Sequence, residues 1–325
     1  YGRRFRGSGA TYGMLTNTAY KDVTADKLNG EFYSDFRANF DGNGKTVKID
    51  IDRSYDSTIH TAALFNDLLD RTAQATYEIK NLTVTGKVAS AGEAPDGNRD
   101  YPNRTAALIG LMRKPWKLSG ITVEDMTINA KGHAGGIVAW IEPENDTTFN
   151  FSNCEINRTE ISSYGGSVGG IVAVMTQHTD VNTNFSRVKL TLEGCQVSGE
   201  IDKLVQLEVK NRTAEQTDSS GTNYLNIQRA VGRSGGLIGY IGPRHSSIGT
   251  AKPVVSVDIH STEVSCAAVI GAYAAGGLIG EYDGSDSASN AAEVTISAAA
   301  IQDCSIEGTR GNVGTSANYD NYGVG

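Results

Sequence analysis

The chain has 325 residues, of which 38 are glycine, 6 are proline and 7% are aromatic. Hydrophobic residues make up 39% and charged residues 20%, which is enough apolar material for a large core and excludes an intrinsically disordered chain. The net charge of -8 provides no basic surface for a phosphate backbone, so nucleic acid is not expected as a partner, and no apolar stretch reaches the ~20 residues of a membrane-spanning helix.

Residues 1–60 precede the repeats that dominate the rest of the chain, and we expect them to form an entry region. Phe32, Phe36 and Phe40 recur at intervals of four in this region. They are predicted to cap the first coil of the repeat array, whose inner face would otherwise be exposed.

A five-residue motif of two small, two aliphatic and one further small residue follows. Four clear copies begin at Gly135, Gly169, Gly235 and Gly276, and two weaker copies begin at Ala62 and Ala106. Adjacent residues of a strand point to opposite faces, so Ile137 and Val138 are expected to make the motif apolar on both sides. The outer side then needs a cover, which can be an inserted loop, another copy of the chain or a neighbouring domain. The predicted partner face consists of Val138, Trp140, Val172, Ile238, Tyr240 and Ile279.

A second motif has apolar residues at steps of two, three and two. Its copies begin at Tyr77, Ile121, Phe149, Leu190, Val257 and Ala299, at offsets of 44, 28, 41, 67 and 42 residues. Steps of two are typical of a strand with one buried face, and the step of three indicates a bend or bulge. The offset of 28 residues is interpreted as one bare coil, and the longer offsets as coils with inserted loops.

The two motifs alternate six times, which predicts an all-β fold: a right-handed parallel β-helix with irregular loop insertions. It is expected to occupy residues 61–325 in about six coils and to continue beyond the C-terminus. The handedness follows the rule for parallel crossover connections. An antiparallel sandwich and a propeller are the alternatives, but strict repetition disfavours the sandwich and the 28-residue coil is too short for a propeller blade.

Several segments resemble the GLUG-type repeats of bacterial surface proteins. They are FDGNGKTV at 40–47, KNLTV at 80–84, and GGLIG at 235–239 and 276–280; the first small-aliphatic motif, AALFN at 62–66, is degenerate. The resemblance covers residues 36–325. It implies a secreted, surface-attached β-helical array that acts as an adhesin or stalk segment, with an extracellular, cell-surface location and no particular enzymatic activity.

Four cysteines occur without C-x-x-C spacing and without a histidine close by, which removes the usual zinc and thioredoxin signatures. Cys154, Cys195 and Cys304 share the third apolar position of the second motif, so we expect them in one inward column. Strands of adjacent coils lie about 4.8 Å apart, which allows a disulfide between Cys154 and Cys195. The alternative is that these residues are buried free thiols, and Cys266 is predicted to lie in a turn.

No catalytic, cofactor-binding or metal-binding residue is predicted, and no cofactor is expected. The five histidines are scattered over different repeat positions, and no serine or cysteine stands in a nucleophile-elbow sequence. Oxygen-rich turns such as 41–44 lack the full ligand spacing of a calcium loop. The longest insertion, about residues 199–229, is the predicted binding loop because function concentrates on loops carried by rigid scaffolds. Its candidate residues are Lys203, Lys210, Arg212 and Tyr224.

These features favour an extracellular structural and adhesive protein over an enzyme. Its expected partner is a host or neighbouring-cell surface molecule, a glycan, or another copy of the chain, without membrane insertion of this segment. One alternative is a carbohydrate-active β-helix enzyme, a polysaccharide lyase or glycoside hydrolase. A second alternative is a self-assembling filament subunit, because both ends of the array look like unfinished coils with exposed edges.

Overall fold

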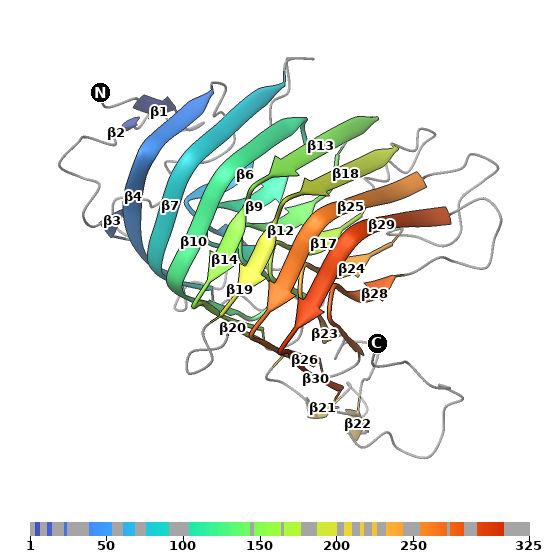
Figure 1. The fold of residues 1–325 in the computed structure, drawn as a ribbon. Helices are drawn as coiled ribbons and strands as arrows, with labels where there is room; N and C mark the ends of the chain where they lie inside the picture. Colours follow the sequence, from blue (N-terminus) through green and yellow to red (C-terminus); the bar gives the residue numbers. More distant parts are fainter. Residues whose placement is uncertain are drawn as a thin grey trace, which may run out of the picture.

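In the computed structural model every described element of regular structure is a β-strand (Figure 1). The structure describes residues 4–6, 12–14, 23–24, 39–53, 61–68, 76–90, 104–143, 146–163, 166–176, 187–199, 205–209, 215–217, 223–225, 232–242, 254–271, 274–282 and 291–308. Within them the strands pair in parallel, except that β1 (Arg4–Arg6) pairs antiparallel with β2 (Tyr12–Met14), and β21 (Glu215–Thr217) with β22 (Asn223–Leu225). The predicted all-β class with parallel strands is confirmed.

The largest sheet, called the long sheet below, has 14 strands. Three passes of the chain cross it as unbroken strands: β4 (Phe40–Arg53), β7 (Tyr77–Ser90) and β10 (Trp116–Ala130). Later passes cross it in shorter pieces: β13 (Thr147–Ser152), β14 (Glu155–Asn157) and β15 (Glu160–Ser163); β18 (Val188–Glu193), β19 (Gln196–Ser198) and β20 (Val205–Val209); β25 (Val254–Ser265) and β26 (Ala267–Gly271); β29 (Ala291–Gln302) and β30 (Ser305–Gly308).

Two smaller sheets have six strands each. The first short sheet contains β5 (Thr61–Ala62), β8 (Arg104–Ala106), β11 (His133–Gly135), β16 (Val168–Gly169), β23 (Arg233–Gly235) and β27 (Ala274–Gly276). The second short sheet contains β6 (Phe65–Leu68), β9 (Ile109–Met112), β12 (Val138–Ile141), β17 (Val172–Met175), β24 (Ile238–Ile241) and β28 (Ile279–Tyr282).

The first six passes each visit the long sheet, then the first and the second short sheet, and the described part of the seventh pass lies in the long sheet. The strands of each pass pair with their counterparts in the neighbouring passes. Figure 1 shows the long strands lying side by side from β4 to β29. This arrangement is consistent with a parallel β-helix, or solenoid. We number the passes from coil 1, which contains β4, β5 and β6, to coil 7, which contains β29 and β30.

Coil 1 begins before the predicted boundary at residue 61. Strand β4 pairs in parallel with β7 from Phe40 to Arg53, and β3 (Val23–Thr24) pairs with β4 on the other side. Phe40 belongs to the continuous core, while Phe32 and Phe36 lie outside the described residues. The regular stack therefore includes residues 40–53, which the sequence assigned to the entry region.

The pairing corrects the predicted alignment of the second motif. Ile121 was expected opposite Tyr77, but it pairs with Leu82, and the residue opposite Tyr77 is Trp116. Ala299 likewise pairs with Thr262 rather than beginning its copy. The aligned copies begin at Tyr77, Trp116, Phe149, Leu190, Val257 and Val294, so the shortest offset is 33 residues and the 28-residue coil does not occur.

This misalignment arises because each coil turns two corners with the same spacing. A residue with positive φ stands at each corner, and the apolar residues on either side of it are three positions apart. The first corner is formed by Asn81, Gly120, Asn153, Gly194, Ser261 and Ala298, and the second by Asp125, Arg158, Cys266 and Asp303. A left-handed residue redirects the strand while both flanking side chains still point inward. The predicted bend at the step of three is therefore confirmed, but it occurs twice in a coil.

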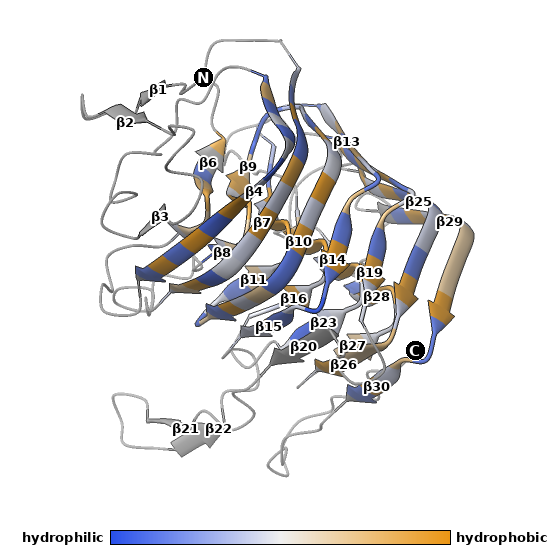
Figure 2. Cartoon of the chain, turned by 60° about the vertical axis from the view of Figure 1, so that its left-hand side comes forward, coloured by the Kyte–Doolittle hydropathy of each residue, from blue (hydrophilic) through white to orange (hydrophobic). Residues whose placement is uncertain are grey.

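The core is one continuous cluster that runs from Phe40 in coil 1 to Ala275 in coil 6. Figure 2 shows the alternation of hydrophilic and hydrophobic residues along β4, β7 and β10 that places one side of each strand in this core. Equivalent inward positions stack from coil to coil, as Ile79, Leu118 and Phe151 do. Such stacking buries the inner face of a coil against its neighbours, since no coil is thick enough to bury its own.

The small-aliphatic motif forms the bend between the two short sheets. The amides of Ile137 and Val138 both donate to the carbonyl oxygen of Ile171, at 3.2 and 2.9 Å, because the chain turns between β11 and β12. Both side chains therefore enter the core cluster. The expectation that adjacent aliphatic residues point to opposite sides is wrong at this bend. In the first five copies of the motif both residues at the aliphatic positions are buried, and in the last copy Leu278 and Ile279 are partly buried.

The glycines of this motif permit close approach between coils. A Cβ atom on Gly170 would stand 2.1 Å from the carbonyl oxygen of Gly236 and 2.7 Å from Val197 Cγ2, whereas a Cβ on Gly44 would meet nothing within 4 Å. We expect Gly170→Ala to lower the free energy of unfolding by about 3 kcal/mol, because the coils must separate. Gly44→Ala should cost about 1 kcal/mol, from its positive φ alone.

Denaturant unfolding of both variants, followed by far-ultraviolet circular dichroism, measures the difference. Equal losses of stability in the two variants would contradict the assigned packing between β16 and β23.

Candidate functional site

Outside the core, side chains of the first short sheet pack on side chains of the second. We call this group the outer cation–aromatic cluster; it consists of Arg104, His133, Trp140, Arg233, Tyr240 and Glu281. The Arg104 guanidinium carbon lies 5.3 Å from the centre of the Trp140 ring, and that of Arg233 lies 4.2 Å from the Tyr240 ring. Both arrangements are within the range of cation–π attraction.

Strand register explains how the cluster forms. Trp140, Tyr240 and Glu281 occupy one outward column of the second short sheet. Arg233 donates from Nη2 to Glu281 Oε1 at 3.0 Å and from Nε to Oε2 at 2.5 Å. Because both groups are largely shielded from water, this bidentate pair is stronger than an exposed ion pair.

His133 stands in the middle of the cluster and is neutral. Its ring meets the Trp140 ring edge to face, with centroids 4.8 Å apart, and its Nδ1 accepts a hydrogen bond from the Ser167 amide at 2.9 Å. The proton of the neutral ring therefore lies on Nε2. Loss of hydration, together with the charges of Arg233 and Arg104, lowers the pKa of His133 to about 3.

The lowered pKa of His133 makes stability depend on pH. Between pH 6.5 and about 3 the unfolded chain binds a proton at this residue and the folded chain does not, so the free energy of unfolding falls as the pH falls. The limiting slope is about 1.4 kcal/mol per pH unit. We expect His133→Asn, which keeps an acceptor for the Ser167 amide, to remove this slope.

Urea unfolding of both proteins at intervals from pH 7 to pH 4 tests this expectation. Parallel curves of stability against pH would show that His133 is not held neutral.

The structure divides the six residues of the predicted partner face. Val138, Val172 and Ile238 form an inward column of the second short sheet and are buried in the core, and Ile279 packs against it. The bend at the small-aliphatic motif turns these side chains inward, so Val138, Val172 and Ile238 are fully buried and Ile279 is partly buried. Trp140 and Tyr240 do lie on the outer side, where Trp140 is 8% exposed and Tyr240 is partly buried.

Sequence reasoning missed Arg104, His133, Arg233 and Glu281 as members of this cluster. A signal was present: Arg104, His133 and Arg233 each stand two residues before the paired small residues of the first motif. Their partners follow that motif and face them across the bend, as His133 faces Trp140. The recurring polar residue before the motif therefore marks this outer contact.

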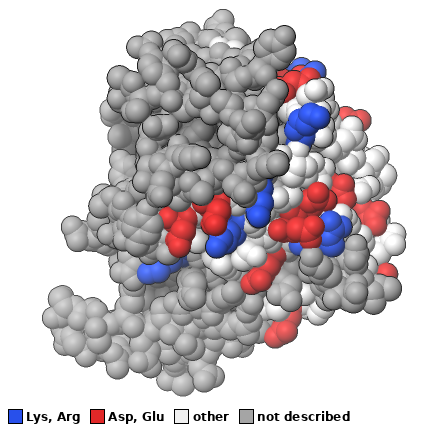
Figure 3. Space-filling model, turned by 90° about the vertical axis from the view of Figure 1, so that its left-hand side faces the viewer, with Lys and Arg blue, Asp and Glu red and all other residues white. Residues whose placement is uncertain are grey.

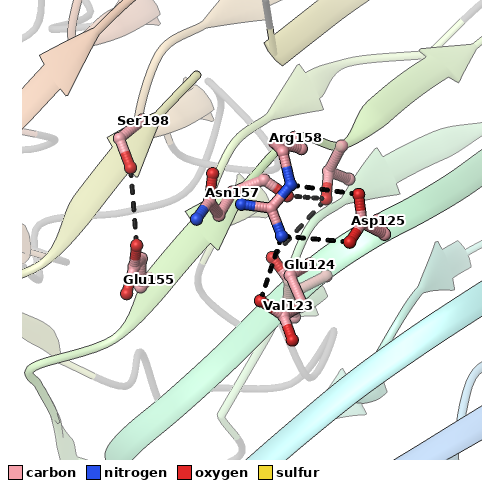
Figure 4. A network of polar contacts seen from close by, with 8 residues as sticks. Val123, Glu124, Asp125, Glu155, Asn157, Arg158 and Ser198 are labelled. Carbon is pink, nitrogen blue, oxygen red and sulfur yellow. Dashed lines mark hydrogen bonds and ion pairs between the residues drawn. The ribbon is translucent and has the colours of Figure 1, made fainter. Parts of the chain in front are cut away.

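A second polar network lies at the second corner of coils 3 and 4 (Figure 4). Arg158 Nε donates to Asp125 Oδ1 at 3.1 Å, and its Nη2 donates to Asp125 Oδ2 at 3.0 Å and to Glu124 Oε2 at 3.4 Å. The neighbouring Thr159 hydroxyl donates to the carbonyl oxygen of Asn157 at 2.8 Å. The network ties one corner residue to its counterpart one coil earlier.

Acidic and basic side chains are intermixed on the described part of the face that carries coil 1 (Figure 3). Lys80 lies 3.6 Å from Glu78 and 4.0 Å from Asp41, and Lys87 lies 3.5 Å from Asp50. These are exposed pairs, each worth at most about 1 kcal/mol. They form no patch of a single sign that would attract a highly charged partner.

Cys154 and Cys195 stack on adjacent coils, one position before a pair of matched residues in β14 and β19, and both are free thiols. The hydrogen-bonding contact with Cys195, and after it burial, raise the pKa of the Cys154 thiol. Cys304 was expected in the same column, but it lies opposite Ala267, after the second corner. Cys266 is the corner residue of coil 6, in agreement with the predicted turn.

Thiol labelling distinguishes the two cysteine environments. In the native state we expect iodoacetamide to modify the partly exposed Cys266 and Cys304 first, and Cys154 and Cys195 only after unfolding, because buried thiols are inaccessible and alkylation requires a thiolate. Mass spectrometry of the labelled peptides identifies the sites. If Cys154 and Cys195 stay unlabelled in denaturant until a reductant is added, they form the disulfide that the sequence allowed.

The residues of the predicted binding loop are not placed by the structure. Lys203, Lys210 and Arg212 lie outside the described residues, as does the side chain of Tyr224, whose backbone belongs to β22. Within the described residues, no group of three His, Cys, Asp or Glu side chains is arranged to hold a metal ion. The same part of the chain contains no helix that is long and apolar enough to cross a membrane.

Comparison of the chain with models of known protein families, with curated proteins and with solved structures finds no match.

Proposed function

We propose that this chain is a right-handed parallel β-helix that serves as a structural and adhesive segment on the outside of a cell, as the GLUG-type resemblance implies. The right-handed crossover follows from the twist of parallel strands. The observation that carries the structural role is the direction of the polar contacts. Outward polar side chains join one coil to the next: Asn81 to Asp41, Ser119 to Glu78, Arg158 to Asp125, Ser198 to Glu155 and Lys189 to Asp258.

Contacts in this direction support a scaffold. Each one restrains the spacing and register of two coils, and together with the core they resist separation of the stack. An enzyme of this architecture instead needs carboxylates or bases that converge on one substrate position. The contacts between coils therefore favour the structural role over the carbohydrate-active alternative.

The adhesive role is assigned to the loops that the scaffold carries. Binding residues of rigid scaffolds are concentrated on long insertions, and the insertion at about 199–229 carries Lys203, Lys210, Arg212 and Tyr224. Basic and aromatic side chains of this kind suit a glycan or an acidic protein surface. A surface molecule of a host or neighbouring cell is the proposed partner.

A bead-binding assay tests this function. Beads coated with the full chain should attach to cells or to glycan arrays, and Lys203→Ser with Lys210→Ser and Arg212→Ser should reduce attachment at least tenfold, because the basic contacts are lost. Lys45→Ser with Lys48→Ser, on the exposed side of β4, is the matched control and should leave attachment unchanged.

Incubation with polysaccharides, followed by chromatography of the products, is run beside it. Cleavage products without any attachment would overturn the adhesive assignment in favour of the enzyme.

A further inference from the structure

The outer cation–aromatic cluster contains buried polar groups that no described residue satisfies. Trp140 is 8% exposed, and its indole N–H has no acceptor in the described part of the chain. Ser167, which stands beside the cluster, is fully buried, and its hydroxyl also lacks a partner among the described residues. Nearly all buried polar groups of folded proteins are hydrogen-bonded, so two such groups in one place indicate a binding partner from outside the chain.

Strand register brings the two groups together around His133. Ser167 directly precedes Val168, which pairs with Ala134 of β11, so Ser167 lies beside His133 in the outward column of the first short sheet. The backbone amide of Ser167 donates to Nδ1 of His133 at 2.9 Å. The Trp140 ring meets the same imidazole edge to face, with the ring centroids 4.8 Å apart. One imidazole therefore contacts both residues.

His133 adds a third group of the same kind. Because its Nδ1 accepts from the Ser167 amide, the proton of the neutral ring lies on Nε2, and no described residue accepts from that N–H. The indole N–H and the Nε2–H can only donate, while a hydroxyl can donate or accept. The partner that suits all three groups is a hydrogen-bond acceptor.

The electrostatic surroundings favour an acceptor with negative charge. Loss of hydration and then the charges of Arg233 and Arg104 lower the pKa of His133, which means that the potential at the ring is positive. The Arg104 guanidinium carbon lies 5.3 Å from the centre of the Trp140 ring. The carboxylate of the cluster, Glu281, accepts from Arg233 through both of its oxygens and is engaged there.

We infer that the outer cation–aromatic cluster, together with Ser167, binds one small oxyanion: a free carboxylate, sulfate or phosphate ion, or the same acidic group on a glycan. Trp140 Nε1–H, His133 Nε2–H and the Ser167 hydroxyl donate to its oxygens, in hydrogen bonds that the negative charge strengthens. Arg104 and Arg233 supply the positive potential. The oxyanion enters beside His133 and Arg233, which are only partly buried.

This site belongs to the scaffold and not to the long insertion that carries the proposed adhesive residues. The inference therefore goes beyond the proposed function and does not depend on it.

Nuclear magnetic resonance of the full, isotopically labelled chain tests the inference, because each of the two tryptophans gives one indole N–H signal. Trp116 is fully buried in the core and serves as the internal reference, and Trp116→Phe assigns the two signals. We titrate with sodium acetate, sulfate and phosphate at constant ionic strength in a Tris chloride buffer. The Trp140 signal should move downfield and saturate, while the Trp116 signal stays in place.

Ser167→Ala removes one donor but keeps the amide that binds His133, and it should weaken oxyanion binding at least tenfold. Thr262→Val is the matched control, since the Thr262 hydroxyl is also buried and without a described partner but lies in the long sheet, away from the cluster. It should leave binding unchanged. An oligomer of a uronic acid is titrated beside acetate: binding at least tenfold tighter than that of acetate identifies a glycan as the source of the acidic group, and equal binding identifies a free ion.

Three outcomes would overturn the inference. The first is a Trp140 signal that none of these anions moves up to about 100 mM, which would mean that water satisfies the cluster. The second is unchanged affinity in Ser167→Ala. The third is an equal movement of both indole signals, which would be a general effect of the salt. Attachment of coated beads is measured separately, so the adhesive function can fail while the oxyanion site holds, and the reverse.

Discussion

In-register stacking of parallel strands is the constraint on which this structure depends. One coil is a single layer of backbone around a thin core, so its inward side chains lose contact with water only when the next coil lies directly above them. Side chains at equivalent inward positions of successive coils must then pack on one another, as Ile79, Leu118 and Phe151 do. Where the backbones of adjacent coils come closest, only glycine fits, as at Gly136 beneath Gly170. Polar contacts between the outward side chains of adjacent coils, such as that of Arg158 with Asp125, maintain the same register from the outside.

The outer cation–aromatic cluster shows how the same constraint acts outside the core. The bend of the small-aliphatic motif brings the outward columns of the two short sheets together, so polar and aromatic side chains are enclosed there as well. His133 is held neutral because its surroundings are both dry and positive. Arg233 can be enclosed because Glu281 accepts hydrogen bonds from its Nε and Nη2 and the Tyr240 ring lies against its guanidinium. Enclosed polar groups therefore take part in fixing the angle between the sheets.

Much of the fold could be predicted from the sequence, because alternation and repetition are local signals. The alignment of the repeats could not, since the steps around Asn81 and Asp125 have equal lengths and only pairing between coils separates the first corner from the second. The directions of Ile137 and Val138 were missed because a rule for straight strands fails at a bend. Arg104 and His133 were visible as recurring polar residues before the motif, but their contact with Trp140 depends on the turn of the backbone.

The position of a coil in the stack bears on the order in which coils separate and form. Among the described residues, coil 7 packs only on the coil before it, so separating it exposes less apolar surface than separating an inner coil from both of its neighbours. At the other end, β4, β7 and β10 each cross the long sheet without a break, over 14, 14 and 15 residues. Each later coil stacks on the coil that precedes it in the chain. During synthesis the emerging chain therefore meets a completed surface at each step, and the slow pairing of distant parallel strands becomes a series of short additions.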